Sequence, residues 1–237
     1  MEFSRRERKK HYMGKYSDFI LAGDIGGTNC NLGIFGIKNK LPELVVSFHF
    51  RSKELKNLYG PINKVLDYAR MEKRISITKC CLGIAGVLSP EKDYVELTNA
   101  NLHVDMKELP LKTRLRKIMM INDFEAVGYG INMLSGRDIR TIRKGIKTPK
   151  APVVVIGAGT GLGKTAMAYD EKKKIYIPMP SEAHHADFPA QNSMELELVE
   201  FIKKFRKTGN VTNGDVLSGE GLESIYLFLR KSRKFNE

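Results

Sequence analysis

Two short glycine-rich segments, each following a run of apolar residues, constrain the fold of this chain more than any other feature. The first, Asp24 to Asn29, interrupts an apolar run that extends from Phe19 to Ile37. The second, Gly157 to Gly163, follows the apolar residues Val153 to Ile156. Both patterns predict a strand, a glycine turn and a return strand. Two such openings in one chain indicate two lobes that arose by an ancient duplication.

The residues after the first glycine segment predict an alternating α/β order. Leu44 to Phe50 alternates like a third strand, and Ile75 to Ala85 has strand character. Between them, Ile62 and Ala69 belong to an apolar series with helical spacing. A chain of 237 residues can build one large or two small hydrophobic cores, so it is long enough for a two-lobed α/β protein.

A carboxylate stands at the next junction between a strand and a helix. We expect a helix to start at Asp105, whose side chain can cap free amide groups, and then the short strand Ile118 to Ile121. Asp123 follows this strand and opens a helix that extends to about Met133. Functional groups in α/β sheets usually lie at such junctions. Asp123 is therefore our candidate general base, and the alternative is that it only caps the helix.

The domain boundaries follow from shifts in composition. Residues 1–18 are expected to form a basic N-terminal extension, and residues 19–135 a lobe with the first glycine turn and Asp123. The segment 136–151 is basic, contains glycine and proline and has no clear period, so we expect it to cross between the lobes. Residues 152–237 then form the second lobe, which ends in two helices.

The second glycine segment also resembles a P-loop. Ala158 to Thr165 fits the relaxed pattern that ends in Gly-Lys-Thr, which leaves a phosphotransferase using Lys164 as an alternative. A P-loop must run into a helix whose N-terminus binds phosphate. Here Thr165 to Tyr169 and Lys174 to Ile177 flank a charged turn like a second hairpin, so we favour strands.

The formal net charge of +13 raises the question of nucleic-acid binding. The basic clusters lie on expected termini, loops or helix ends, at residues 5–10, 137–150, 203–207 and 230–234. No aromatic residues alternate with them in a stacking pattern. We therefore interpret the clusters as solvated faces and expect no nucleic-acid partner, with a basic nucleic-acid-binding module as the weakest alternative.

The apolar runs and the cysteines bear on location. All apolar runs are far shorter than the roughly 20 residues that cross a bilayer, and the N-terminus lacks the apolar segment of a signal peptide. We expect a cytoplasmic protein without a membrane partner. Cys30, Cys80 and Cys81 are odd in number and lack the spacing of metal ligands, so we interpret them as small buried residues.

The two glycine segments carry groups that can handle phosphate. Glycines let backbone amides approach phosphate oxygens, and Thr28 and Thr160 each add a hydroxyl. The carboxylate of Asp24 can hold a magnesium ion, usually through water. A plain hairpin turn is the alternative for either segment.

A polar cluster follows the second hairpin. Residues 181–188 include two carboxylates and two imidazoles. Glu182 provides one of the carboxylates and His185 one of the imidazoles. A metal site would need further ligands that the sequence does not announce. Such acceptors and donors are the groups a site needs to bind sugar hydroxyls.

Taken in order, six segments resemble the bacterial-type glucokinase family, whose members have the hexokinase and actin-like ATPase (ribonuclease H-like) fold. The resemblance extends from about Phe19 to Leu229 and rests on Gly23–Asn29, Leu97–Asn99, Ile121–Val127, Gly157–Gly163, Glu182–Phe188 and Val216–Gly219. Each segment alone is a weak signal, but six in family order are specific.

The resemblance implies a two-lobed α/β kinase that transfers the terminal phosphoryl group of ATP to the 6-hydroxyl of glucose or a related hexose. It implies that Asp123 is the base and that Asp24 lies near Mg²⁺. The implied sugar ligands are Asn99, Asn122, Asp123, Glu182 and His185. The implied nucleotide ligands are Asp24, Gly26, Gly27, Thr28, Asn29, Gly159, Thr160 and Gly161.

Three departures from the family pattern modify this expectation. Ala183 and His184 stand where the family has two glycines, so hexose preference is expected to differ. A further sugar-binding glutamate aligns with Gly214 or Asp215. The sequence ends at Glu237, before the family's adenosine loop, so we expect an incomplete second lobe whose nucleotide site a partner or a homo-oligomer completes. A non-catalytic sugar-binding or regulatory homologue of the same fold is the main alternative.

Overall fold

The computed structural model describes residues 2–7, 13–97, 102–146 and 148–232. The chain divides into two compact units, Met1–Val127 and Gly128–Glu237. Each unit has its own sheet and its own hydrophobic core.

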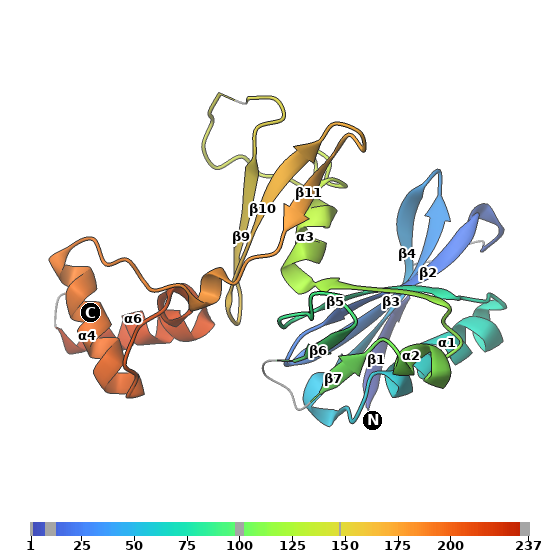
Figure 1. Cartoon of the computed structure of the whole chain (residues 1–237), viewed down its shortest axis with the longest axis horizontal. Helices are drawn as coiled ribbons and strands as arrows, with labels where there is room; N and C mark the ends of the chain where they lie inside the picture. Colours follow the sequence, from blue (N-terminus) through green and yellow to red (C-terminus); the bar gives the residue numbers. More distant parts are fainter. Residues whose placement is uncertain (1, 8–12, 98–101, 147, 233–237) are drawn as a thin grey trace. The chain divides into compact units, whose positions relative to one another are not determined.

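The first unit is built on a six-stranded sheet with the order β1-β4-β3-β2-β5-β8 (Figure 1). Strands β2, β5 and β8 are parallel neighbours, whereas β1, β4, β3 and β2 are antiparallel in succession. The elements are β1 (Phe3–Glu7), η1 (Met13–Lys15), β2 (Asp18–Ile25), β3 (Asn29–Lys38), β4 (Leu41–Arg51), η2 (Ser52–Glu54), α1 (Tyr59–Lys73), β5 (Lys79–Ile84), β6 (Tyr94–Glu96), β7 (His103–Asp105), α2 (Glu108–Lys112), β8 (Lys117–Asn122) and α3 (Asp123–Ile131).

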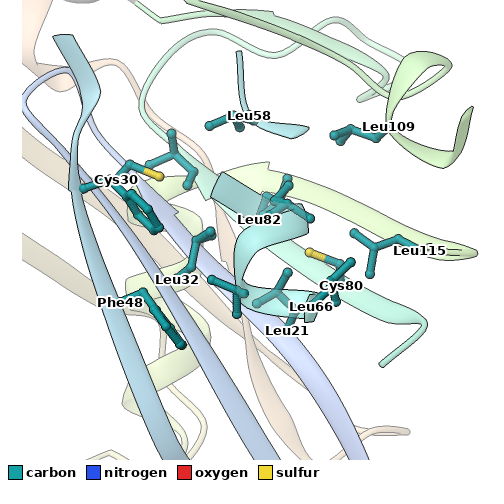
Figure 2. Close-up of a cluster of buried hydrophobic side chains, with 14 of the residues drawn as sticks. Leu21, Cys30, Leu32, Phe48, Leu58, Leu66, Cys80, Leu82, Leu109 and Leu115 are labelled. Carbon is teal, nitrogen blue, oxygen red and sulfur yellow. The ribbon is translucent and has the colours of Figure 1, made fainter. Parts of the chain in front are cut away.

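The core of the first unit lies between this sheet and α1. The buried positions Ile62, Val65, Leu66 and Ala69 recur at helical spacing, so they form one apolar stripe of α1. Figure 2 shows Leu66 beside leucines of β2, β3 and β5. Cys30 and Cys80 are small buried members of this core, as predicted, whereas Cys81 is only partly buried. Burial raises the pKa of the Cys30 thiol to about 12.

The second unit contains a three-stranded antiparallel sheet with the order β11-β10-β9, followed by helices (Figure 1). Its elements are β9 (Val153–Ala158), β10 (Leu162–Asp170), β11 (Ile175–Met179), η3 (Ala183–His185), α4 (Ser193–Arg206), α5 (Asn213–Val216) and α6 (Gly219–Lys231). Its core is a small cluster formed by Leu198, Ile202, Val211, Val216 and Phe228. The predicted strands and helices on both sides of the two glycine turns are thereby confirmed.

The helix expected from Asp105 begins later, at Glu108, so its predicted start is wrong. Asp105 is the last residue of β7, where it pairs with Tyr94 of β6. Its carboxylate accepts a hydrogen bond from the amide of Lys107 at 2.7 Å, so it caps a turn that precedes α2. The pairing of Val104 with Val95 makes this segment a strand, and this hairpin was not predicted.

The N-terminal residues form a strand that the sequence did not predict. Phe3–Glu7 pairs with β4 along the edge of the sheet, and the Phe3 ring stacks on Phe48 and Phe50. All five strand residues are exposed, which explains why their polar pattern does not alternate. This part of the expected extension therefore belongs to the first unit.

The boundary between the units lies within α3, between Val127 and Gly128, whereas the sequence placed it after residue 135. A Cβ at Gly128 would lie 3.1 Å from the Thr165 methyl group and closer still to Pro178. The second half of α3 therefore packs on β10 and β11. The segment 136–151, expected to cross between the lobes, lies wholly in the second unit, and α3 is the link.

In the described part of the chain, no helix is both long enough and apolar enough to cross a membrane.

Candidate active site

The first glycine turn joins β2 to β3 and is held from outside by Ser52. Within the turn, the Gly26 amide donates to the Asn29 carbonyl at 2.8 Å. The Ser52 amide donates to the Thr28 carbonyl at 2.9 Å, and the Ser52 hydroxyl donates to the Gly26 carbonyl at 2.6 Å. Ser52 is only 1% exposed, whereas Thr28 and Asn29 are exposed. The turn is thus anchored at its base and open at its tip.

Asp24 stands at the end of β2 with an exposed carboxylate. The Asn31 side-chain amide of β3 donates to this carboxylate at 3.2 Å. The Asn31 amide oxygen in turn contacts Nδ1 of His49 on β4 at 2.8 Å. Sequence reasoning missed both supporting residues. The register provides a signal, because Asp24 pairs with Asn31, and Asn31 with His49.

Asp123 lies near Asp24 because strands β2, β5 and β8 are parallel and end at one edge of the sheet. Asp24 pairs with Gly83, and Ile84 pairs with Asn122. A Cβ at Gly83 would lie 3.7 Å from the Asp123 Cα and 3.1 Å from the Cβ of Ala126. A glycine on the central strand therefore leaves room for the start of α3 against the sheet.

The environment of Asp123 raises the pKa of its carboxyl group above the usual range. Burial is the main cause, and the negative charge of Asp24 acts in the same direction. Hydrogen bonds, including one from the Phe124 amide at 2.8 Å, oppose part of this rise in pKa. A carboxylate with a raised pKa is a stronger base than one in water, which suits proton acceptance.

Asn122 provides the side-chain cap of α3. Its side-chain oxygen accepts from the amides of Phe124 at 2.9 Å and Glu125 at 3.1 Å, and its side-chain nitrogen is 3.4 Å from the Gly86 carbonyl. Asn122, rather than Asp123, caps this helix, because the Asn122 side-chain oxygen accepts from the Glu125 amide. The interpretation of Asp123 as only a helix cap is therefore wrong.

Glu125 is a buried carboxylate beside the start of α3 that sequence reasoning did not single out. It is 5% exposed and forms an ion pair with Lys92 at 3.0 Å. Lys92 has a left-handed backbone with φ of 53°. No local pattern announces this pair, because its partners are far apart in the sequence.

The second glycine turn joins β9 to β10 and has an equivalent internal hydrogen bond. The Gly159 amide donates to the Gly161 carbonyl at 2.8 Å, and the Gly159 carbonyl accepts from the Gly219 amide of α6 at 2.9 Å. Gly159 and Thr160 are exposed. Because Lys164 lies within β10 and no helix follows the turn, the P-loop alternative is wrong.

The segment with Glu182 and His185 forms the short helix η3 after β11. Glu182 and His185 are exposed, so both can contact a ligand. Asp215, one of the two residues aligned with the family glutamate, accepts from the Thr212 amide and hydroxyl at 2.8 Å in a capping box. Its carboxylate therefore has a structural partner. Gly214, the other, lies against the ring of His184.

The predicted site residues thus form one group in each unit. Asp24, the first turn, Asn122 and Asp123 lie at one sheet edge of the first unit. The second turn contacts η3 in the second unit. Asn99 lies outside the described residues.

Curated relatives share this sequence along most of its length. A glucokinase from Nostoc sp. is 34% identical over 220 residues, which cover 92% of this chain and 62% of that protein. A glucokinase from Synechocystis sp. is 32% identical, with 92% of this chain and 62% of that protein covered. The chain therefore spans about 60% of the length of these relatives.

Solved structures share the fold. A glucokinase from an Antarctic psychrotroph superposes with a TM-score of 0.72 at 23% identity, over 93% of this chain and 66% of that one. A glucokinase from Balamuthia mandrillaris, solved in complex with glucose, gives 0.74 at 22% identity, over 92% and 64%. These likenesses establish the actin-like ATPase fold. The family model named Glucokinase matches residues 21–237, so the chain belongs to the glucokinase family.

Proposed function

We propose that this chain phosphorylates glucose at its 6-hydroxyl with ATP as the donor. The observation that carries this proposal is the partly buried Asp123 carboxyl group with its raised pKa, next to a glycine turn in a member of the glucokinase family. A base in this position can receive the proton of an attacking hydroxyl.

The proposed reaction is an in-line transfer. The sugar 6-oxygen forms a bond to the terminal phosphorus of ATP while the bond from that phosphorus to the bridging oxygen breaks, leaving ADP. Asp123 accepts the proton that the hydroxyl loses. Phosphoryl transfer involves little covalent participation by protein, so positioning and charge stabilisation supply most of the catalysis.

The two glycine turns are proposed to hold the phosphates. Gly159 is exposed and Gly26, Gly27 and Gly161 are partly exposed, so a phosphate can approach their backbone. Thr28 and Thr160 add exposed hydroxyl groups. A Cβ at Gly26 would meet nothing closer than the Asn29 carbonyl at 3.5 Å, and one at Gly159 would meet its first atom at 3.9 Å. Both turns thus have open space on that side.

Asp24 is the residue that would hold Mg²⁺. Its exposed carboxylate is a hard oxygen ligand, and magnesium commonly binds one or two carboxylates plus phosphates and water. Within the described residues there is no group of three or more His, Cys, Asp or Glu that could hold a metal ion, so a fully protein-ligated cage does not fit. When bound, Mg²⁺ supplies positive charge to the phosphates.

The sugar ligands are also proposals. Asn122 lies next to the base, and Glu182 and His185 present exposed polar groups. Asn99 is included because of the family resemblance alone. Hydrogen bonds to several hydroxyls would select a hexose, because a substrate that lacks one would leave a polar group unpaired.

Exposed apolar side chains of the second unit suggest that further polypeptide covers it. Val153, Val154 and Ile156 of β9 are exposed, Ile156 by 63%. We propose that a partner chain or a second copy of this chain covers these residues. The cytoplasmic location stays a prediction.

A coupled assay of ADP formation tests the function. The purified chain is given ATP or GTP with glucose, mannose or fructose, and glucose binding is measured separately by calorimetry. Glucose-dependent ADP formation, however slow, supports the kinase. Glucose binding without any ADP formation supports the non-catalytic sugar-binding alternative. If the chain neither binds glucose nor forms ADP, both the kinase and the non-catalytic sugar-binding alternative are contradicted.

A further inference from the structure

We infer that His184 is a positioning residue that fixes the tip of the second glycine turn to the segment carrying Glu182 and His185. This inference deepens the proposed function and rests on it, because it assigns a role within the proposed phosphate and sugar sites. It concerns contacts within the second unit only.

The first contact is a hydrogen bond to the backbone. The Leu162 amide, immediately after the turn, donates to Nδ1 of His184 at 3.1 Å. A ring nitrogen that accepts a hydrogen bond carries no hydrogen, so the neutral ring bears its hydrogen on Nε2. The ring therefore binds the turn as a specific acceptor.

The second contact is a fit between the ring and two glycines. A Cβ at Gly214 would overlap the His184 ring, with Cε1, Nδ1 and Nε2 all far inside van der Waals distance. A Cβ at Gly161 would lie 2.9 Å from Nδ1. The ring thus occupies the space between the turn and α5 that the absence of these two side chains leaves.

These contacts join the turn to η3. Besides its own strands, the turn is held by the Gly219 amide on the Gly159 carbonyl and by the His184 ring. His184 lies two residues after Glu182, and its ring also makes an edge contact with the ring of His185 at 4.8 Å between centroids. A displacement of the turn therefore disturbs the two proposed sugar ligands, and a loss of the ring frees the turn.

The first test measures the hydrogen bond itself. Amide hydrogen exchange of Leu162 is followed by NMR in the full chain and in its His184→Ala and His184→Asn variants. His184→Ala should speed exchange about tenfold, since one backbone hydrogen bond is lost. His184→Asn should restore much of the protection, because its side-chain oxygen can accept at a similar place. Unchanged exchange in His184→Ala would overturn the inference.

The second test is a double-mutant cycle. Gly214→Ala should displace the ring and speed Leu162 exchange, whereas Gly209→Ala, where an added Cβ meets nothing within 4 Å, is the matched control. In the His184→Ala background, Gly214→Ala should have little further effect because the ring is already absent. If the effects of His184→Ala and Gly214→Ala on Leu162 exchange are fully additive, Gly214 does not act by making room for the His184 ring.

Ligand binding separates this inference from the proposed function. With calorimetry, His184→Ala should weaken ATP binding about fivefold to tenfold, while His184→Asn weakens it less. If the unaltered chain binds neither ATP nor glucose, the proposed function fails, and Leu162 exchange still decides whether His184 fixes the turn. Equal ATP affinity in the unaltered chain and His184→Ala would overturn the positioning role.

Discussion

The two glycine turns have the same local construction but different support. In each, the amide of the first glycine of the turn bonds to a carbonyl a few residues later at 2.8 Å. The first turn is anchored by Ser52, which is buried against a six-stranded sheet. The second belongs to a three-stranded sheet and is anchored by the N-terminal residue of α6 and by His184.

The hydrophobic cores of the two units also differ in size, and the first unit has the larger one. The first unit buries apolar residues from β2, β3, β4, α1 and β5 in one cluster, as Figure 2 shows for its leucines and Phe48. The core cluster of the second unit is formed by residues of its helical part, while β9 exposes Val153, Val154 and Ile156. A turn on a large core is fixed by the fold, whereas a turn on a small one depends on single side chains.

The largest expected effect tests whether the first unit carries the chemistry. Asp123→Asn should lower turnover by about 10²-fold or more while glucose affinity changes only a few-fold, because only proton acceptance is removed. Steady-state kinetics and calorimetry measure the two effects. Asp67→Asn, which removes an exposed carboxylate paired with Arg114, is the control. Full turnover by Asp123→Asn would remove this residue from the mechanism.

Core truncation tests the difference in support. Leu82→Ala should cost about 2–5 kcal/mol of unfolding free energy, mainly in the first unit. Ile202→Ala should have a similar cost but unfold the second unit more completely, because fewer buried residues remain there. Hydrogen exchange measured unit by unit distinguishes these outcomes. Leu111→Ala, which shortens an 82% exposed side chain, is the control. A shared response of both units to either variant would contradict the comparison.

Adding a methyl group tests whether both turns receive phosphate. Gly26→Ala and Gly159→Ala should leave the fold intact, since the nearest protein atoms lie at 3.5 and 3.9 Å. Each should weaken ATP binding about tenfold while glucose binding persists, because the methyl group blocks close approach of phosphate. Gly145→Ala, with no atom within 4 Å, serves as the reference in calorimetry. Unaltered ATP affinity would make the corresponding turn a structural hairpin only.

Two serines test the anchors. Ser52→Ala leaves the partly buried Gly26 carbonyl without its hydroxyl donor and should cost about 1–3 kcal/mol of unfolding free energy. Ser218→Ala removes the cap of α6, where the hydroxyl oxygen accepts from the Gly221 amide at 3.0 Å, and should cost about 1 kcal/mol. Denaturant titration measures both costs. A larger loss of unfolding free energy in Ser218→Ala than in Ser52→Ala would contradict the expected order.

The smallest effect concerns pH. The Asp24 charge contributes to the raised pKa of Asp123, so Asp24→Asn should lower that pKa. Since the base must be ionised to act, the acid limb of the kcat/KM profile should move to lower pH, even where Asp24→Asn lowers the absolute rate. Asp93→Asn, at a carboxylate bonded to Ser89, is the control. A limb that moves to higher pH would contradict this electrostatic assignment.

The sequence by itself determined the hairpins and the junction that carries Asp123. Alternating apolar residues, glycines and the change from strand to helix period are local properties, so the two turns and α3 follow from neighbouring residues. The order of segments also indicated the family, which the match over residues 21–237 confirms. The roles of the individual site residues stay predictions, because they need a bound substrate.

Only the tertiary structure decided which distant residues support these segments. The pairing of Phe3–Glu7 with β4, the ion pair of Lys92 with Glu125 and the bond from Asn31 to Asp24 all join residues that are separate in the sequence. The same holds for the His184 ring, which lies against Gly214 of α5. Local patterns specify an element and its period. The space that one side chain leaves for another exists only after the chain has folded.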